Sequence, residues 1–419
     1  MARRSVIRSL VASASVALVA SAATSAVAAR GDLDGSFSGD GYTATTFPGG
    51  GGTFYGVGLD GSAPTGCGQG GVTLIGVRRE GGPLEPAFSG DGRLRIDPTG
   101  TGTSALQSCT YLADGRLLGV GWVDQSADAR MLVAVFTPDG KADRRFSRDG
   151  FATIRFPGAP GAFGYGVAVQ RDGRIVVVGE TYDDSVTPRE GDFAIARLTP
   201  RGALDDTFSG DGRTTVSFGA ESDGAWKVAI DSDGRIVVAG WADDTVTGDY
   251  DSAVAVLRPR GMPDAGFGDG GSRIFDLSSG EDDYVNGLDL RHDDRIVLGS
   301  TFPGGPGHAI VQLRPGGGYD GSFGGGDGVV ENVTPAMNLR DLQVHERRII
   351  FGGEWSGAPQ FVRLRPLGNL DATFGSGGVA PISELSGGRI DDLVHDPKGR
   401  IVASGQSGAG HPLLLRVQA

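Results

Sequence analysis

The stretch LDDTFSGDG, residues 204–212, decides the fold because versions of it recur along the chain. Seven versions carry a phenylalanine at the same place: Phe37, Phe88, Phe146, Phe208, Phe267, Phe323 and Phe374. Successive phenylalanines lie 51 to 62 residues apart. A regular period of this length is typical of proteins built from repeated supersecondary units.

Two further phrases recur with the same count and identify the repeat as a β-structure. One is Asp-Gly-Arg followed by apolar residues, as at 172–179, and the other ends in Arg-Leu-x-Pro, as at 193–200. Each repeat has four β-branched-rich runs bounded by Gly, Asp or Pro, which predict four strands. Asp172-Gly173 between two apolar runs predicts a hairpin turn. We therefore expect an all-β, seven-bladed propeller with four antiparallel strands per blade. The alternative is a solenoid, which would need capping ends that the sequence does not show.

The two ends of the repeat region predict how the ring closes. Residues 42–47 correspond to the last strand of a repeat, whereas residues 413–417 correspond to the third strand. The N-terminal strand can therefore complete the last blade and remove both free edges. The alternative phasing closes the ring without strand exchange.

The phrase L-D-x-x-F-S-G-D-G followed by D-G-R-I-V-V-x-G resembles the delta-60 repeat family over residues 32–419. The resemblance implies a propeller-like repeat domain in a surface or secreted bacterial protein, and it brings no catalytic residues. The chain departs from the pattern at residues 142–145, 324–326 and 345–347, where we expect shifted turns.

Residues 1–29 have the features of an export signal, so the predicted mature domain spans residues 30–419. Arg3, Arg4 and Arg8 precede an apolar stretch at 10–20 and small residues at 26–28. An uncleaved membrane anchor is the alternative, and the arginine pair also resembles a twin-arginine signal. No later stretch approaches membrane-spanning length. We expect a secreted, periplasmic or cell-surface monomer.

Charge and cysteine content narrow the partners. Removing residues 1–29 removes three arginines and no acid, so the net charge changes from −13 to −16. This charge argues against nucleic acid as a partner. Cys67 and Cys109 are the only cysteines, and in an exported protein they are candidates for a disulfide, with two buried thiols as the alternative.

The first candidate site is the mouth of the central channel. The position nine residues before each Asp-Gly-Arg arginine, at the start of the innermost strand, is predicted to face the channel. The residues there are Tyr55, Gln107, Tyr165, Trp226, Asn286, Leu339 and Asp391. A ring this rich in aromatic and amide groups could hold a small ligand, or it could be a hydrated rim.

The second candidate is the set of loops between the second and third strands, which are acidic and aromatic. They contain Trp122, Tyr182, Trp241 and Trp355. Trp122 and Trp241 could stack on sugar rings or could cover the ends of their blades. Asp243 and Asp244 are the candidate metal ligands, because Ca²⁺ prefers clustered carboxylate oxygens, and Ca²⁺ is the one cofactor considered. The repeated Asp-Gly phrases themselves are expected to be structural turns.

Familiar catalytic motifs are absent from the sequence. The five histidines are scattered, and neither a zinc-binding pattern nor a G-x-S-x-G elbow occurs. The sequence therefore favours a non-catalytic binding or scaffold module for a glycan, peptide or surface partner. A hydrolase or lyase with its site in the central channel is the alternative, and a purely structural role is the third possibility.

Overall fold

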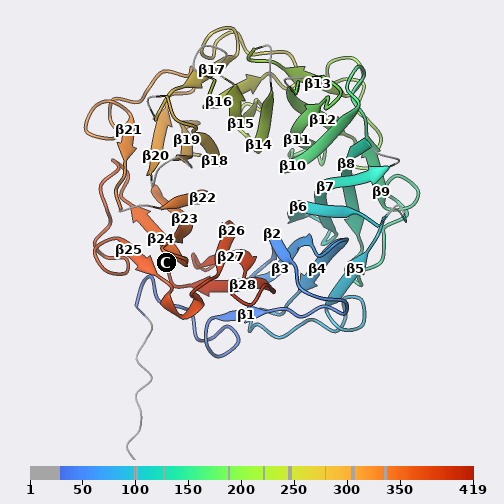
Figure 1. The fold of residues 1–419 in the computed structure, drawn as a ribbon, viewed down its shortest axis with the longest axis vertical. Helices are drawn as coiled ribbons and strands as arrows, with labels where there is room; N and C mark the ends of the chain where they lie inside the picture. The colour runs from blue at the N-terminus through green and yellow to red at the C-terminus, as the bar shows by residue number, and fades with distance from the viewer. Residues whose placement is uncertain are drawn as a thin grey trace, which may run out of the picture.

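Seven antiparallel sheets of four strands stand in a ring in this computed structural model (Figure 1). It describes residues 29–98, 100, 102–125, 128–186, 189–219, 222–243, 248–278, 280–302, 307–334 and 337–419. The predicted seven-bladed propeller is confirmed. The predicted signal segment lies almost entirely outside the described residues. Among the described residues, no helix is long and apolar enough to cross a membrane.

Each blade runs from an innermost strand at the ring centre to an outermost strand at the rim (Figure 1). Blades 1 to 3 comprise β2 (Thr53–Asp60), β3 (Ala63–Gln69), β4 (Thr73–Val77) and β5 (Arg93–Ile96); β6 (Ser104–Tyr111), β7 (Leu117–Gln125), β8 (Asp128–Phe136) and β9 (Phe151–Ile154); β10 (Gly161–Val169), β11 (Ile175–Tyr182), β12 (Phe193–Leu198) and β13 (Arg213–Val216). Blades 4 to 6 comprise β14 (Asp223–Ile230), β15 (Ile236–Asp243), β16 (Tyr250–Leu257) and β17 (Ser272–Phe275); β18 (Tyr284–Leu290), β19 (Ile296–Phe302), β20 (Gly307–Leu313) and β21 (Val329–Glu331); β22 (Asn338–His345), β23 (Arg348–Trp355), β24 (Ala358–Leu364) and β25 (Val379–Pro381). Blade 7 comprises β26 (Arg389–His395), β27 (Ile401–Gln406), β28 (Pro412–Val417) and β1 (Tyr42–Ala44), and a 3₁₀ turn, η1 (Ser383–Leu385), precedes it.

Strand exchange closes the ring, as predicted. β1 pairs antiparallel with β28, with Tyr42 opposite Leu415. Asp34, just before β1, forms a 2.6 Å ion pair with the fully buried Arg416 of β28. The N-terminal segment therefore supplies both the outer strand and a buried charge partner of the last blade.

The repeated Leu-Asp-x-x-Phe phrase is structural. Asp205 forms ion pairs with Arg197 and Arg174, each 2.8 Å long. The guanidinium of Arg197 also lies 4.8 Å from the ring centre of Phe208, which is completely buried. Because the carboxylate of Asp205 is already neutralised by two arginines, these contacts favour the turn role over a calcium site in each blade.

A disulfide joins Cys67 of blade 1 to Cys109 of blade 2. Both residues are buried in the apolar interface between these blades. Reduction by dithiothreitol is expected to lower the free energy of unfolding by about 3 kcal/mol, because it releases a cross-link between segments distant in sequence. Urea unfolding with and without reductant measures this difference. Equal midpoints in both buffers would show that the disulfide does not contribute.

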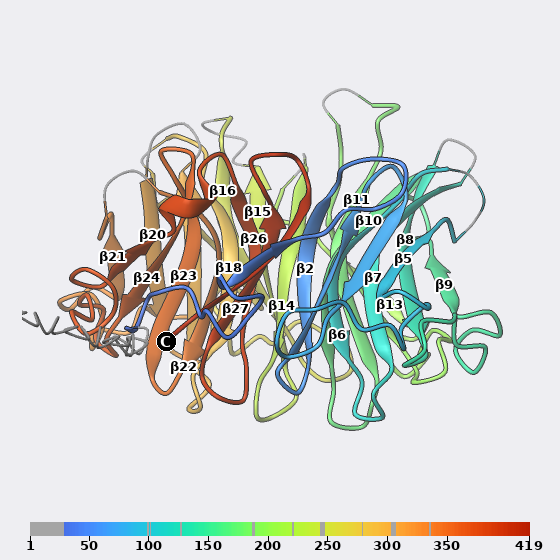
Figure 2. The same ribbon diagram turned by 90° about the horizontal axis from the view of Figure 1, so that it is seen from below.

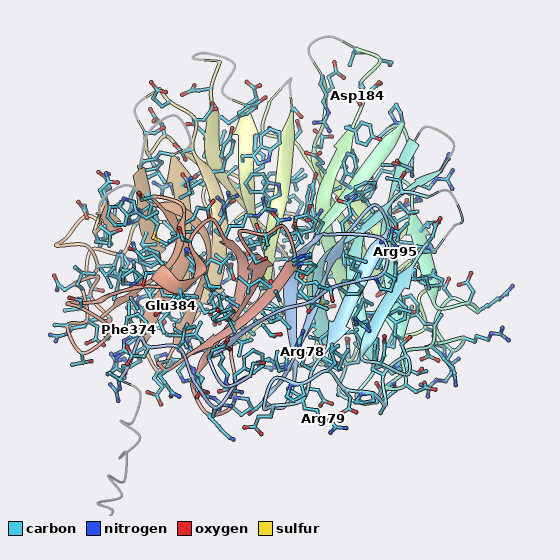
Figure 3. The ribbon with its side chains drawn as sticks, turned by 60° about the horizontal axis from the view of Figure 1, so that its bottom comes forward. Arg78, Arg79, Arg95, Asp184, Phe374 and Glu384 are labelled. Atoms are coloured by element: carbon cyan, nitrogen blue, oxygen red, sulfur yellow. A yellow bond between two sulfur atoms is a disulfide. The ribbon has the colours of Figure 1, made fainter. Side chains whose placement is uncertain are left out.

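The two faces of the ring differ in the turns that they carry (Figure 2). We call the face with the loops between second and third strands the loop face, and the face with the Asp-Gly-Arg turns the turn face. Figure 3 shows Asp184 at the loop face and Arg79 toward the opposite face. The innermost strands begin at the loop face, since Thr53 at the start of β2 pairs with Gln69 at the end of β3.

Candidate binding site at the channel mouth

Every innermost strand has one β-bulge near its start. The unpaired residues at the bulges are Tyr55, Gln107, Tyr165, Trp226, Asn286, Arg340 and Asp391. A bulge re-aims the side chain of the extra residue. All seven residues line one cavity of about 760 Å³ at the ring centre. The bulge is thus the device that points one side chain per blade into the channel.

Six of the seven ring residues predicted from the sequence lie in this cavity, and the prediction for blade 6 is wrong. Leu339 is completely buried in the apolar core, and Arg340 takes its place at the bulge. Blade 6 has a shorter first turn, because Val344 pairs with Ile349, whereas Val169 of blade 3 pairs with Ile175 one residue further on. Counting back from the turn arginine therefore misplaces the position by one.

One side of the mouth is aromatic. Tyr165 stacks on Phe163 with 6.3 Å between ring centres, and its hydroxyl donates a 3.1 Å hydrogen bond to Glu180. Burial raises the pKa of Glu180, although the ion pair with Arg189 at 2.9 Å opposes this shift. Trp226 of the next blade packs against Tyr284 with 5.5 Å between ring centres. Two neighbouring blades therefore present supported aromatic rings to the cavity.

Trp122 and Trp241, which the sequence marked for ligand binding, do not line this cavity. Trp122 packs edge-on against Phe163 at 5.5 Å, so it stands behind the ring that supports Tyr165. Trp241 is only 8 % exposed and packs against Tyr284 at 6.4 Å, on the ring that supports Trp226. Their position corresponds to the alternative in which they cover the ends of their blades.

The other side of the mouth is charged. The guanidinium of Arg340 donates a 3.0 Å hydrogen bond to Glu354, and Arg389 donates one of 3.1 Å to Asp391. Burial raises the pKa of Asp391, and the arginine charge opposes this shift. Between the charged and aromatic sides, Asn286 donates a 2.9 Å hydrogen bond to the carbonyl oxygen of Leu339.

Several polar groups of the mouth have no partner among the described residues. The Tyr55 hydroxyl, the Gln107 amide and the Trp226 indole N–H face the cavity, and no hydrogen bond within the described chain involves them. Such groups bind either water or a ligand, because polar groups in a cleft retain their hydrogen-bonding demand. The mouth thus offers free donors and acceptors beside aromatic rings.

Below the ring lies a charge cluster that sequence reasoning missed. Lys227 of blade 4 reaches Asp341 of blade 6 at 2.7 Å and Asp392 of blade 7 at 3.7 Å. Asp341 accepts a hydrogen bond from the Leu393 amide, and Asp392 accepts one from the Val57 amide, so each carboxylate also holds the next blade. Burial raises the pKa of Asp341 well above its usual range, and the ammonium of Lys227 opposes this shift.

The position of this cluster in the repeat could have revealed it. Each of the three residues directly follows a bulge residue, where three other blades have a glycine at Gly56, Gly166 and Gly287. A Cβ at Gly287 would lie 2.7 Å from the Leu342 side chain of the neighbouring blade. A charged residue at a position otherwise restricted by close packing is therefore an anomaly of the sequence.

The predicted calcium ligands are not tested. Asp244 lies outside the described residues, and the Asp243 amide donates a 3.3 Å hydrogen bond to Asp223. A second acidic group stands nearby in sequence, where carboxylate oxygens of Asp251, Asp276 and Asp283 lie within 4.8 Å of one another. Calcium binding therefore stays a prediction, and it is tested by comparing thermal unfolding with millimolar Ca²⁺ and with chelator.

Three solved structures illustrate the similarity of chain course. An unknown-function protein from Dyadobacter fermentans is 10 % identical with a TM-score of 0.47, covering 90 % of this chain and 98 % of that one. Sqt1 from Chaetomium thermophilum is 14 % identical at 0.47, covering 88 % and 96 %. The PQQ-bound aldose sugar dehydrogenase from Streptomyces coelicolor is 14 % identical at 0.43, covering 74 % and 92 %. These likenesses carry no argument about function.

The comparison with sequence families is more specific. No curated protein sequence matches this chain. Residues 170–208 and 232–267 match the family described as "Domain of unknown function (DUF5122) beta-propeller". Each matched segment runs from an Asp-Gly-Arg turn to the motif phenylalanine, Phe208 or Phe267. Blades 3 and 4 therefore carry the sequence signature of the DUF5122 beta-propeller domain.

Proposed function

We propose that this protein is an exported, non-catalytic binding module that holds a glycan in the loop-face mouth of its channel. The observation that carries the proposal is the set of seven bulge residues that line one cavity of about 760 Å³. Aromatic rings bind the apolar faces of sugar rings, and free amide and hydroxyl groups bind sugar hydroxyls. Tyr165 and Trp226 supply the rings, while Tyr55 and Gln107 supply polar groups.

The location and the family assignment are part of the same proposal. The basic, apolar and small-residue segments of residues 1–29 support export. The Cys67–Cys109 disulfide is compatible with an oxidising compartment outside the cytoplasm. We assign the repeats to the delta-60 type on the quoted motifs, and we expect the module to act as a monomer on a glycan of the cell surface or its surroundings.

A glycan array followed by calorimetry tests the proposal with the mature chain, residues 30–419. Trp226→Ala is expected to weaken binding of the best glycan by about tenfold or more, since one aromatic stacking contact and its buried area are lost. Gln107→Ala is expected to give a smaller loss.

The matched control is Trp355→Ala, which removes a 42 % exposed tryptophan from the same face without touching the cavity. Its affinity for the glycan should equal that of the wild type. A stronger effect at Trp355 than at Trp226 would move the binding site to the outer loops, and the absence of any glycan hit would refute glycan binding.

A hydrolase or lyase at the same channel is the second candidate, and one observation favours it. The mouth holds Asp391, whose pKa burial raises, and the floor holds Asp341, whose pKa burial also raises. Glycoside cleavage uses one protonated and one ionised carboxyl group. Incubation of a bound glycan with wild type and Asp391→Asn separates the candidates: cleavage by the wild type alone would establish an enzyme.

A further inference from the structure

The first turn of blade 6 departs from its equivalents in composition as well as in length. Glu346 and Arg347 connect β22 to β23 with φ angles of 46° and 69°. The corresponding turns of blades 2, 3, 4 and 7 place glycines there, with φ near 80° at Gly115, Gly173, Gly234 and Gly399. Residues other than glycine at positive φ are costly, and such positions are enriched at functional sites.

This short turn is surrounded by cavities on the turn face. Glu346 lines three of them, with volumes of about 490, 200 and 330 Å³. Arg347 lines the largest and the third. Because the turn is one residue shorter than that of blade 3, it leaves this space unfilled between blades 5, 6 and 7.

The largest cavity is basic, although the chain as a whole has a net charge of −13. It is lined by four arginines and two acids: Arg30, Arg347, Arg348, Arg365, Glu346 and Asp371. The backbone of the N-terminal segment brings Arg30 here, because its carbonyl oxygen accepts a 2.7 Å hydrogen bond from Gly375.

The acids in this cavity do not neutralise its cations. Asp371 already receives 3.0 Å contacts from both Arg348 and Arg363. Burial alone would raise the pKa of Asp371, but hydrogen bonds from Thr373 and the charge of Arg363 lower it to about 2. Arg365 therefore has only a 3.7 Å contact with a carboxylate that is already occupied.

The remaining arginines are available to a ligand. No ion pair among the described residues involves the side chain of Arg30 or Arg347, and both residues are exposed. Burial lowers the pKa of the neighbouring Arg363, and the charges of Arg348 and Arg30 lower it further. Like charges have thus gathered without matching acids, which favours binding of an anion.

We propose that Arg30, Arg347 and Arg365 form a binding site for an oxyanion, either a phosphate or a carboxylate group, on the turn face. The planar guanidinium group donates two parallel hydrogen bonds to either kind of oxyanion. Glu346 stands in the same cavities and weakens the attraction, so it limits the affinity of the site. This site lies on the opposite face from the proposed glycan mouth and is independent of it.

Calorimetry on the mature chain tests the site with inorganic phosphate and, separately, with citrate, at matched ionic strength set with chloride. The two titrations distinguish phosphate from carboxylate as the preferred group. The double variant Arg347→Gln/Arg365→Gln is expected to weaken binding by about tenfold or more, because charged hydrogen bonds are lost.

Glu346→Gln is expected to tighten binding by about fivefold, because a repulsive charge near the anion is removed. A residue with a purely structural role in the turn would not produce a tighter complex. This variant therefore distinguishes an anion site from a turn that is merely unusual.

The matched control is Arg260→Gln/Arg314→Gln, which removes two arginines from equivalent turns of blades 4 and 5 outside these cavities. Its anion affinity should equal that of the wild type. The proposal is overturned if neither anion binds the wild type, if the control loses as much affinity as the cleft variant, or if Glu346→Gln weakens binding.

Discussion

Removal of residues 30–47 from the mature protein is expected to abolish its cooperative thermal unfolding. The deletion takes away β1 and leaves the backbone edge of β28 unpaired. It also removes Phe37, which is completely buried, and Asp34, the ion-pair partner of the buried Arg416. An unpaired strand edge and an uncompensated buried charge are both strongly destabilising.

Circular dichroism and size-exclusion chromatography measure this outcome. We expect the shortened chain to aggregate or to unfold without a sharp transition. A synthetic peptide of residues 30–47 added in trans should restore the transition, which separates ring closure from a general effect of truncation. A shortened chain that melts like the intact one would contradict closure by strand exchange.

Lys227→Met is expected to lower the free energy of unfolding by about 4 kcal/mol, because it leaves two buried carboxylates without their cation. Asp341 and Asp392 each hold the innermost strand of the next blade through a backbone amide. Repulsion between these carboxylates should therefore loosen blades 6, 7 and 1 together. Urea unfolding at neutral pH measures the loss.

A rescue variant makes this prediction specific. Lys227→Met/Asp341→Asn/Asp392→Asn removes the charges but keeps an oxygen acceptor for each backbone amide, so we expect it to regain most of the lost stability. Lys141→Met is the control, because its ion pair with Asp139 is exposed and should change stability by less than about 0.5 kcal/mol. Equal losses for Lys227→Met and the triple variant would show that packing of the lysine, rather than its charge, matters.

The fold was predictable because the repeat supplies the same evidence seven times. The motif phenylalanines, the Asp-Gly-Arg turns and the incomplete first and last repeats together specified blade number, strand count and closure. The bulge ring was predictable for the same reason, since a fixed offset from the turn arginine located Tyr55, Gln107 and Trp226 correctly. The offset failed only where blade 6 lacks a residue in its turn, which moved the position from Leu339 to Arg340.

What the sequence could not provide is contact between blades. Lys227 meets Asp341 across two blade boundaries, and no local pattern measures that distance. Trp122 and Trp241 were correctly placed on the loop face, but their packing behind Tyr165 and Trp226 depends on how neighbouring blades meet. The basic cavity near Arg347 is likewise assembled from blade 6 and the N-terminal segment.

The crystal structure of the mature chain with its tightest-binding glycan tests the central claim most directly. The account predicts a sugar ring in the loop-face mouth, stacked on Trp226 or Tyr165, with its hydroxyls bonded to Gln107 or Tyr55. A glycan bound outside this cavity, for example against the exposed Trp355, would contradict the claim.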